Sequence, residues 1–323
     1  MTNPDPGPGP GPGQRAHRRL GLGLVVISAA GFGSLAVFAK FAYAAGLNVA
    51  DVLVLRFGIA APLLWLLAAA SRRRLRLARP AALRLLAMGA VGYALQATLF
   101  FSALTRISAS MAALLLYLYP ALVTAGAVLL GRHRADLATA AGLTLALGGT
   151  ALILGRPGER LDRLGVALGL AAACWYTAYI LVGESLLGGV DPLVASAYVA
   201  TGAAVSFLAF GGGLGLLDFT AAAPGGYAAA AGMAVLGTAL AIAAFFGGIV
   251  LVGSAWASIA SSFEPVFTVA LGVAVLGDPL GAGKVAGGLA VVAGAIVVPL
   301  LHRPVKPAIR RGTMPGITGP GGR

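Results

Sequence analysis

The amino-acid sequence predicts an all-α membrane protein with ten transmembrane helices, arranged as two inverted five-helix repeats. Three observations favour this fold class: the chain is strongly apolar, its apolar residues form long spans, and its second half matches its first. Of the 323 residues, 59% are hydrophobic and only 10% are charged, whereas soluble domains are about 25% charged. Such a chain needs a lipid environment.

Ten apolar spans follow one another along the chain. Each has roughly the 20 residues that a helix needs to cross the hydrocarbon core of a bilayer. The expected spans are 20–44, 50–70, 81–103, 107–130, 135–155, 164–187, 192–214, 227–249, 253–277 and 282–301. The first continues about 15 residues beyond Ser28-Ala29-Ala30, too far for a signal peptide, so we interpret it as a transmembrane helix.

Neither end of the chain has the composition of a folded segment. Residues 1–14 contain an alternating run of Pro and Gly, which disfavour helix, and residues 303–323 combine Pro, Gly and basic residues. We therefore expect disordered cytoplasmic tails at 1–19 and 303–323. Between them we expect a first five-helix repeat at 20–155 and a second at 164–302.

The net charge of +13 comes mainly from arginines in short runs between the apolar spans. This pattern is typical of cytoplasmic loops in membrane proteins, so we expect no nucleic-acid partner. With the N-terminus inside, the cytoplasmic side holds fifteen Lys and Arg residues and the opposite side five. The heavy use of Ala, Gly, Leu, Val and Arg is typical of a high-GC bacterium. We expect a multi-pass protein of the bacterial cell (inner) membrane, with both termini cytoplasmic.

The internal repeat emerges when the chain is aligned with itself at an offset of 145 residues. Pro120 then meets Pro265, each within an apolar span. Two later glycine pairs also match: Gly142 with Gly287, and Gly149 with Gly294. Similar composition alone is the alternative explanation, but the shared proline and glycines favour a duplication. Because five is an odd number of helices, the second half must enter the membrane upside down, as in many alternating-access transporters.

Several short segments carry a resemblance to a known family. The VLRF segment contains Arg56, and the YLYP and FEPV segments end on or contain Pro120 and Pro265. An LGD-P turn at 276–279 is followed by a helix that contains Gly287 and Gly294, seven residues apart. In this order and spacing, the chain resembles the EamA family of the drug/metabolite transporter superfamily over residues 20–301. The resemblance implies a secondary transporter that exports or exchanges small organic metabolites, such as amino acids or drugs.

Glu264 is the clearest candidate for a functional residue. It lies 11 residues into its span, about 16 Å deep and close to the midplane, where a carboxylate needs a partner or a watery cavity. The following Pro265 lacks an amide hydrogen, so the carbonyl of Ser261 loses its helical donor. Glu264 is expected to bind a substrate ammonium group or to carry a coupling proton; the alternative is a structural hydrogen bond to a neighbouring helix.

The repeat pairs Tyr119 with Glu264, so we expect a phenol and an acid on opposite walls of one cavity. Other candidates for substrate binding are aromatic or polar groups within the spans, which commonly line pockets for small organic molecules. They are Tyr93, Gln96, Tyr117, Trp175 and Trp256. A packing or interfacial role is the alternative for each of them.

Arg56 and Lys40 each lie about 8 Å inside the outer boundary of their spans. Two positive charges at one depth would attract anions to an outward-facing vestibule. Lys40 is able instead to extend its ammonium group to the interface. Arg56 needs carbonyls or an acid such as Asp51 as its partner, and we include it among the substrate-binding candidates. Arg84 is expected to be an interfacial anchor.

Other functional classes fit the sequence less well. An enzyme would need a nucleophile with a base, or a metal cluster, but the three histidines lie in tails or loops and no GxSxG or HExxH motif occurs. The single cysteine, Cys174, excludes a cysteine zinc site. We expect no catalytic residue, metal or cofactor. The expected partners are a small-molecule substrate, a proton as a further candidate, and lipid, with the chain a monomer or homodimer. The alternative is a non-transporting structural or receptor-like membrane protein.

Overall fold

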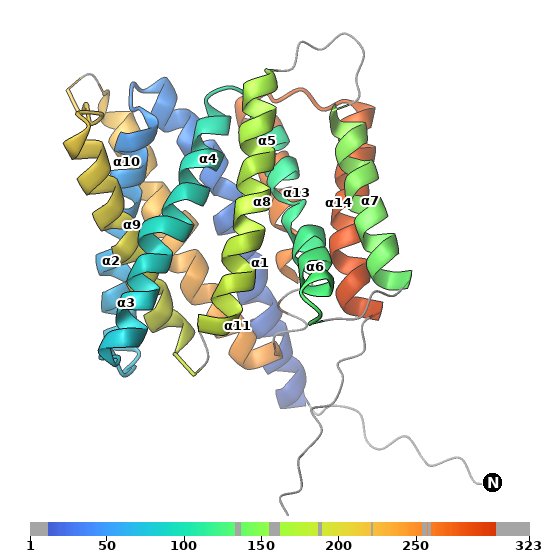
Figure 1. Cartoon of the computed structure of the whole chain (residues 1–323), viewed down its shortest axis with the longest axis horizontal. Helices are drawn as coiled ribbons and strands as arrows, with labels where there is room; N and C mark the ends of the chain where they lie inside the picture. Colours follow the sequence, from blue (N-terminus) through green and yellow to red (C-terminus); the bar gives the residue numbers. More distant parts are fainter. Residues whose placement is uncertain are drawn as a thin grey trace, which may run out of the picture.

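The computed structural model describes residues 12–132, 137–154, 162–186, 189–220, 222–253, 257 and 260–301. All regular structure in this part of the chain is helical, and the helices stand side by side in one bundle (Figure 1). The helices of the first half are α1 (Pro12–Ala44), α2 (Val49–Ala70), α3 (Arg79–Ala87), η1 (Met88–Tyr93), α4 (Ala94–Leu104), α5 (Ala109–Leu116), α6 (Tyr119–Leu129) and α7 (Leu137–Leu154). Those of the second half are α8 (Arg163–Leu186), α9 (Pro192–Gly213), α10 (Pro224–Ala234), η2 (Val235–Leu240), α11 (Ala241–Val252), α13 (Glu264–Leu276) and α14 (Ala282–Leu301).

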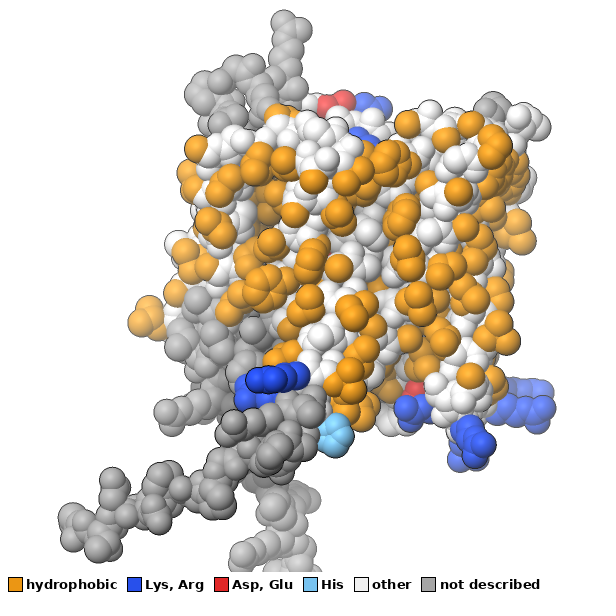
Figure 2. All heavy atoms as spheres, turned by 180° about the vertical axis from the view of Figure 1, so that it is seen from behind, with side chains coloured by type: hydrophobic (Ala, Val, Ile, Leu, Met, Phe, Trp, Pro, Cys, Tyr) orange, Lys and Arg blue, Asp and Glu red, His pale blue; other side chains and the backbone are white. Residues whose placement is uncertain are grey.

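The helices have the length and surface of a multi-pass membrane protein. Within the described ranges, seven helical segments are long and apolar enough to cross a membrane. Three shorter apolar helices, Ala140–Leu154, Glu264–Leu276 and Ala282–Ile296, fall within further expected spans. Hydrophobic side chains cover the face seen in Figure 2, whereas Lys and Arg side chains lie toward its two ends. The count of ten spans stays a prediction.

One expected boundary is wrong. Helix α1 begins at Pro12, so residues 12–19, which we expected in a disordered tail, are helical. The segment from Gln14 to Arg19 is rich in good helix formers, and a proline is tolerated in a first turn because its missing N–H has no helical acceptor there. The rest of both expected tails lies outside the described residues.

Helices that the repeat makes equivalent pack against each other in opposite directions. In α2 and α9, the ring of Phe57 stacks on Phe207 with centroids 5.5 Å apart, and the indole nitrogen of Trp65 donates to the hydroxyl of Thr201 at 3.0 Å. Residue numbers therefore rise along α2 as they fall along α9. The other main contacts also occur as exchanged pairs, since α1 packs on α11 and α13, and α8 packs on α4 and α6.

Helices α7 and α14 meet through the glycines that the repeat aligns. A Cβ on Gly149 would lie 2.5 Å from the carbonyl oxygen of Gly287, and one on Gly294 would lie 2.6 Å from that of Gly142. Small residues allow such close backbone contact between membrane helices. Since Gly142 corresponds to Gly287 and Gly149 to Gly294, exchanging the two halves converts one contact into the other.

A π-helical turn interrupts the same helix in each half. η1 separates α3 from α4, and η2 separates α10 from α11. Such turns are rare and frequently occur at functional sites. η1 packs on α9 and η2 packs on α2, so each turn meets the opposite half. They place Tyr93 and Thr238 near the centre of the bundle.

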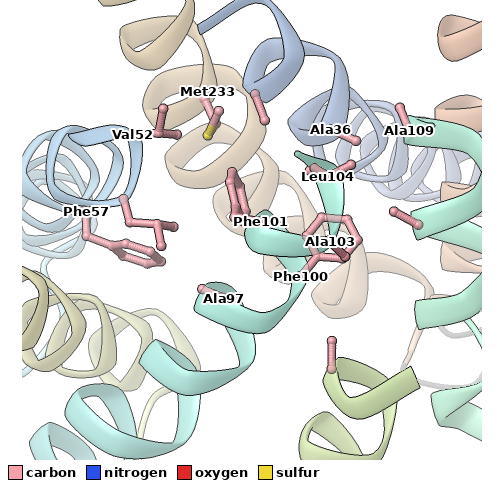
Figure 3. Packing of buried hydrophobic residues seen from close by; sticks show 14 of the residues in the cluster. Ala36, Val52, Phe57, Ala97, Phe100, Phe101, Ala103, Leu104, Ala109 and Met233 are labelled. Atoms are coloured by element: carbon pink, nitrogen blue, oxygen red, sulfur yellow. The ribbon is translucent and has the colours of Figure 1, made fainter. Parts of the chain in front are cut away.

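The largest buried core surrounds α4. Figure 3 shows Phe100, Phe101 and Leu104 of α4 between Met233 of α10 and Ala109 of α5. Many of the other buried residues are alanines, which let the helices approach closely. This packing holds α1, α2, α4 and α5 around the site described below.

The close contact at Gly149 predicts opposite effects for neighbouring substitutions. Gly149→Ala should lower the free energy of unfolding by about 1–3 kcal/mol, because its methyl group overlaps the backbone of α14. Gly148→Ala is the matched control, since a Cβ there meets nothing within 4 Å; it should leave stability unchanged or raise it slightly through helix propensity. Thermal unfolding in detergent measures both, and equal melting temperatures for the two variants would contradict the prediction.

Candidate functional site

A cavity of about 130 Å³ lies between the two halves. We call it the central cavity. Its walls come from α1, α2, η1, α4, α5, α6, α8 and α13, so both halves contribute. Its polar and aromatic lining residues are Phe32, Arg56, Tyr93, Gln96, Phe100, Phe101, Tyr117, Tyr119, Tyr176, Glu264 and Thr268.

Six of the eight residues that the sequence suggested for substrate binding line this cavity. They are Arg56, Tyr93, Gln96, Tyr117, Tyr119 and Glu264. Trp175 is not among the lining residues: its indole nitrogen donates to the carbonyl of Gly92 at 2.8 Å, and its side chain lines a crevice between α3 and α8. Trp256 lies outside the described residues.

Tyr176 lines the cavity where Trp175 was expected. Its ring centroid lies 4.7 Å from that of Tyr119, and it stacks on Tyr179 at 5.9 Å. On a helix, residues three apart share a face whereas adjacent residues do not. Trp175 and Tyr176 therefore point to different sides of α8, and the spacing of the aromatic residues alone does not tell which of them faces the cavity, since Tyr179 lies near Tyr176 and also lines the crevice with Trp175.

The cavity lies where two helices are interrupted. α5 ends at Leu116 and α6 begins at Tyr119, and α13 begins at Glu264, with a proline in the first turn of both α6 and α13. The carbonyl of Ser261, which Pro265 deprives of a helical donor, accepts a hydrogen bond from the hydroxyl of Tyr117 at 3.4 Å. A side chain from the first half thus donates a hydrogen bond to the backbone of an interrupted helix in the second half.

The side chain of Glu264 is half-buried in the cavity wall. Among the residues that the structure describes, its carboxylate has no hydrogen-bond donor and no basic partner. α1 packs close behind it, since a Cβ on Gly33 would lie 3.0 Å from the carbonyl oxygen of Glu264. The carboxylate therefore lines the cavity without a donor from the described part of the chain.

Arg56 adds a buried positive charge to the lining, and it is only 2% exposed. Its Nε donates to the hydroxyl of Thr238 at 3.0 Å, and its Nη2 donates to that of Tyr93 at 3.4 Å. The guanidinium carbon lies 4.8 Å from the ring centroid of Phe57 and 5.3 Å from that of Phe101. Hydroxyls and ring faces hold the guanidinium, while its charge is not neutralised by an acid in the described chain.

Asp51 and Lys40 both bond to backbone groups near the ends of helices. The carboxylate of Asp51 accepts hydrogen bonds from the backbone of Asn48 and Asp218, which caps α2. Asp51, which was one of the partners considered for Arg56, therefore bonds elsewhere, and hydroxyl groups take its place. Lys40 extends to the end of α4, where its ammonium group donates to the carbonyl of Ile107 at 2.8 Å. It is not among the lining residues of the central cavity.

A second cavity, of about 360 Å³, lies beside the first. Its lining includes Phe57, Tyr93, Tyr179, Pro192 and Thr238. Tyr93 lines both cavities, and Thr238 holds the guanidinium that lines the first. These side chains therefore stand between the two spaces.

Comparison with known proteins agrees with this architecture. The EamA-like transporter family matches the chain twice, over residues 19–155 and 163–300. A comparison with curated proteins finds no match. A solved structure, described as "Crystal structure of protein", has a TM-score of 0.62 at 20% sequence identity and covers 88% of this chain and 98% of that chain. At this identity the likeness shows the fold alone.

The two family matches coincide with the two halves that the offset of 145 residues relates. Together they cover nearly the whole chain. The family is one of transporters, and the helices have the lengths and apolar surfaces of membrane spans. The chain is a multi-pass membrane protein and belongs to the EamA-like transporter family.

Proposed function

We propose that the protein is a secondary transporter that exports or exchanges small organic metabolites, such as amino acids or drugs, across a bacterial inner membrane by alternating access. The central cavity is the observation that carries this proposal. It lies between the two halves and combines the carboxylate of Glu264 with the guanidinium of Arg56. A solute with both an ammonium and a carboxylate group would find a partner for each.

The size of the cavity favours a small solute. Its volume of about 130 Å³ is close to that of engineered protein cavities that hold one benzene molecule. The row of Tyr117, Tyr119 and Tyr176 offers ring faces and hydroxyls, which suit an organic molecule with an apolar part. Glu264 is proposed to bind an ammonium group or to carry a coupling proton, and Arg56 to bind a carboxylate.

Ten spans in two inverted repeats form the proposed topology, with both termini in the cytoplasm. The antiparallel packing of α2 on α9 and the exchanged glycine contacts of α7 and α14 support the inverted repeat. The exposed arginines between α2 and α3 support the orientation, because such runs stay on the cytoplasmic side. A monomer and a homodimer are both compatible with this topology.

Hydrogen bonds at the end of α13 hold the two halves of the protein together. Oδ2 of Asp278 accepts hydrogen bonds from the backbone nitrogen of Ser110 at 2.8 Å and from its hydroxyl at 2.7 Å. These bonds join the start of α5 to the turn after α13, and so connect the two halves. Alternating access requires such a contact to break when the halves separate.

The alternative is a structural or receptor-like membrane protein without transport. Medium from cells that overexpress the protein, compared by metabolomics with that of control cells, would identify the exported solute. Counterflow of this solute in proteoliposomes then tests the proposal. Saturable exchange supports a transporter, and the absence of saturable flux for every solute would exclude one.

Replacing Glu264 with Gln should reduce transport at least about tenfold, because the substitution removes a charge that a bound ammonium group needs. If Glu264 carries the coupling proton, the pH dependence of transport should also disappear. Initial rates in proteoliposomes over a range of external pH measure both effects. Unchanged rates with an unchanged pH profile would exclude Glu264 from transport.

Asp162→Asn is the control for that substitution. Asp162 is a partly exposed acid just before α8 that pairs with Arg106 at 3.1 Å, and a hydrogen bond from the backbone of Gly165 lowers its pKa. Asn also accepts this hydrogen bond, so the cap of α8 is kept. The variant should transport at the wild-type rate with the wild-type pH profile.

Replacing Thr238 with Val should destabilise the protein by about 1–3 kcal/mol, because a buried guanidinium loses a hydrogen-bond acceptor. The control is Thr98→Val, since the hydroxyl of the exposed Thr98 donates to the carbonyl of Ala94, one turn earlier in the same helix. Thermal unfolding in detergent compares the variants. If both melt at the wild-type temperature, Thr238 does not hold Arg56.

A further inference from the structure

A crevice outside both cavities separates α8 from α3 and η1. We call it the α3–α8 crevice; its volume is about 340 Å³. Its lining is almost entirely apolar apart from one arginine at its end. The lining residues are Arg84, Ala87, Met88, Gly92, Trp175, Ala178, Tyr179 and Val182.

The crevice is a trough with α3 and η1 on one wall and α8 on the other. Arg84 in α3 and Gly92 in η1 mark its ends on one wall. The bond from the indole of Trp175 to the carbonyl of Gly92 joins the two walls at the inner end. Beside the trough, Leu83 and Val91 are 65% and 62% exposed. Side chains of this kind face lipid, so the trough opens toward the bilayer.

The end of the crevice at Arg84 carries positive charge. Arg84 is exposed, and among the described residues it has neither an acidic partner nor a hydrogen-bond acceptor. Five further exposed arginines precede it on the same connection: Arg72, Arg73, Arg74, Arg76 and Arg79. Within the described chain, Arg73 is the member of this group that pairs with an acid, Asp191, at 3.3 Å.

We propose that the α3–α8 crevice binds one anionic phospholipid from the leaflet on the side of Arg84. The phosphate pairs with the guanidinium of Arg84, and an acyl chain lies along Ala87, Met88 and Ala178. An apolar trough with a cationic end is complementary to an apolar chain with an anionic end, and basic pockets between transmembrane helices bind such lipids. The proposal depends on membrane embedding and goes beyond the proposed transport function.

The crevice also adjoins the second cavity. Tyr179 lines both the crevice and the second cavity. Its ring lies 5.9 Å from that of Tyr93, which lines the central cavity. An acyl chain in the crevice therefore contacts a side chain that also borders the second cavity.

Thermal unfolding of the purified full chain in detergent tests the proposal. Phosphatidylglycerol should raise the melting temperature in a saturable manner, whereas phosphatidylcholine with the same acyl chains should not. Arg84→Gln should weaken the apparent affinity for phosphatidylglycerol by about fivefold, the effect of one basic residue near an anionic surface. Arg84→Lys should retain most of the affinity.

Two controls separate the crevice from general attraction. Arg76→Gln removes an exposed arginine that does not line the crevice and should leave the affinity unchanged. Ala178→Phe fills the trough without changing charge; since Ala178 is exposed, the melting temperature without lipid should be unchanged while the lipid effect is lost.

Four outcomes with the lipids and variants would overturn the proposal, and a fifth comes from a soluble anion. The four are equal stabilisation by the two lipids, an unchanged response in Arg84→Gln, equal losses in Arg84→Gln and Arg76→Gln, and an unchanged response in Ala178→Phe. Glycerol 3-phosphate, which has the headgroup phosphate without acyl chains, is tested alongside. Full stabilisation by this soluble anion would also overturn the proposal, because it would assign Arg84 to a soluble ligand. None of these measurements depends on transport.

Discussion

The hydrocarbon core offers no water to backbone N–H and C=O groups, so each must find a partner inside the protein. Unbroken helices meet this requirement along most of the chain. The interruptions before α6 and before α13 do not, and both border the central cavity. The carbonyl of Ser261 instead accepts a hydrogen bond from the hydroxyl of Tyr117, which belongs to the other half. Where the helices break, the two halves depend on each other.

Close helix packing then decides where space remains. Glycine contacts bring α7 against α14 with backbones touching, and alanines fill much of the core around α4. Bulky side chains gather instead around the cavities, where Tyr117, Tyr119, Tyr176 and Tyr179 form a connected row of rings. Small residues thus form the frame, and aromatic residues form the walls of the site.

Much of this arrangement follows from patterns along the chain. Hydropathy predicts spans such as 50–70 and 192–214, whose helices α2 and α9 differ from them by one residue at an end. The shared offset of Pro120 and Pro265 predicts that Tyr119 and Glu264 line one cavity. These features are readable because a single local property, apolar length or a proline, determines each of them.

Other features depend on packing that no local pattern encodes. The hydroxyl that holds Arg56 belongs to Thr238, which lies 182 positions away in a π-helical turn. The choice between Trp175 and Tyr176 depends on how α8 is rotated in the bundle. The acid that seemed available to Arg56, Asp51, is used to cap its own helix.

Tyr93 lines both cavities, and this position bears on the rate at which a solute could pass between them. If a solute moves from one space to the other, it passes the phenol of Tyr93 and its partner Arg56. If these groups also hold the solute, each bond that strengthens its retention raises the barrier to its departure. Selectivity and turnover are then set by the same few atoms, and improving one slows the other.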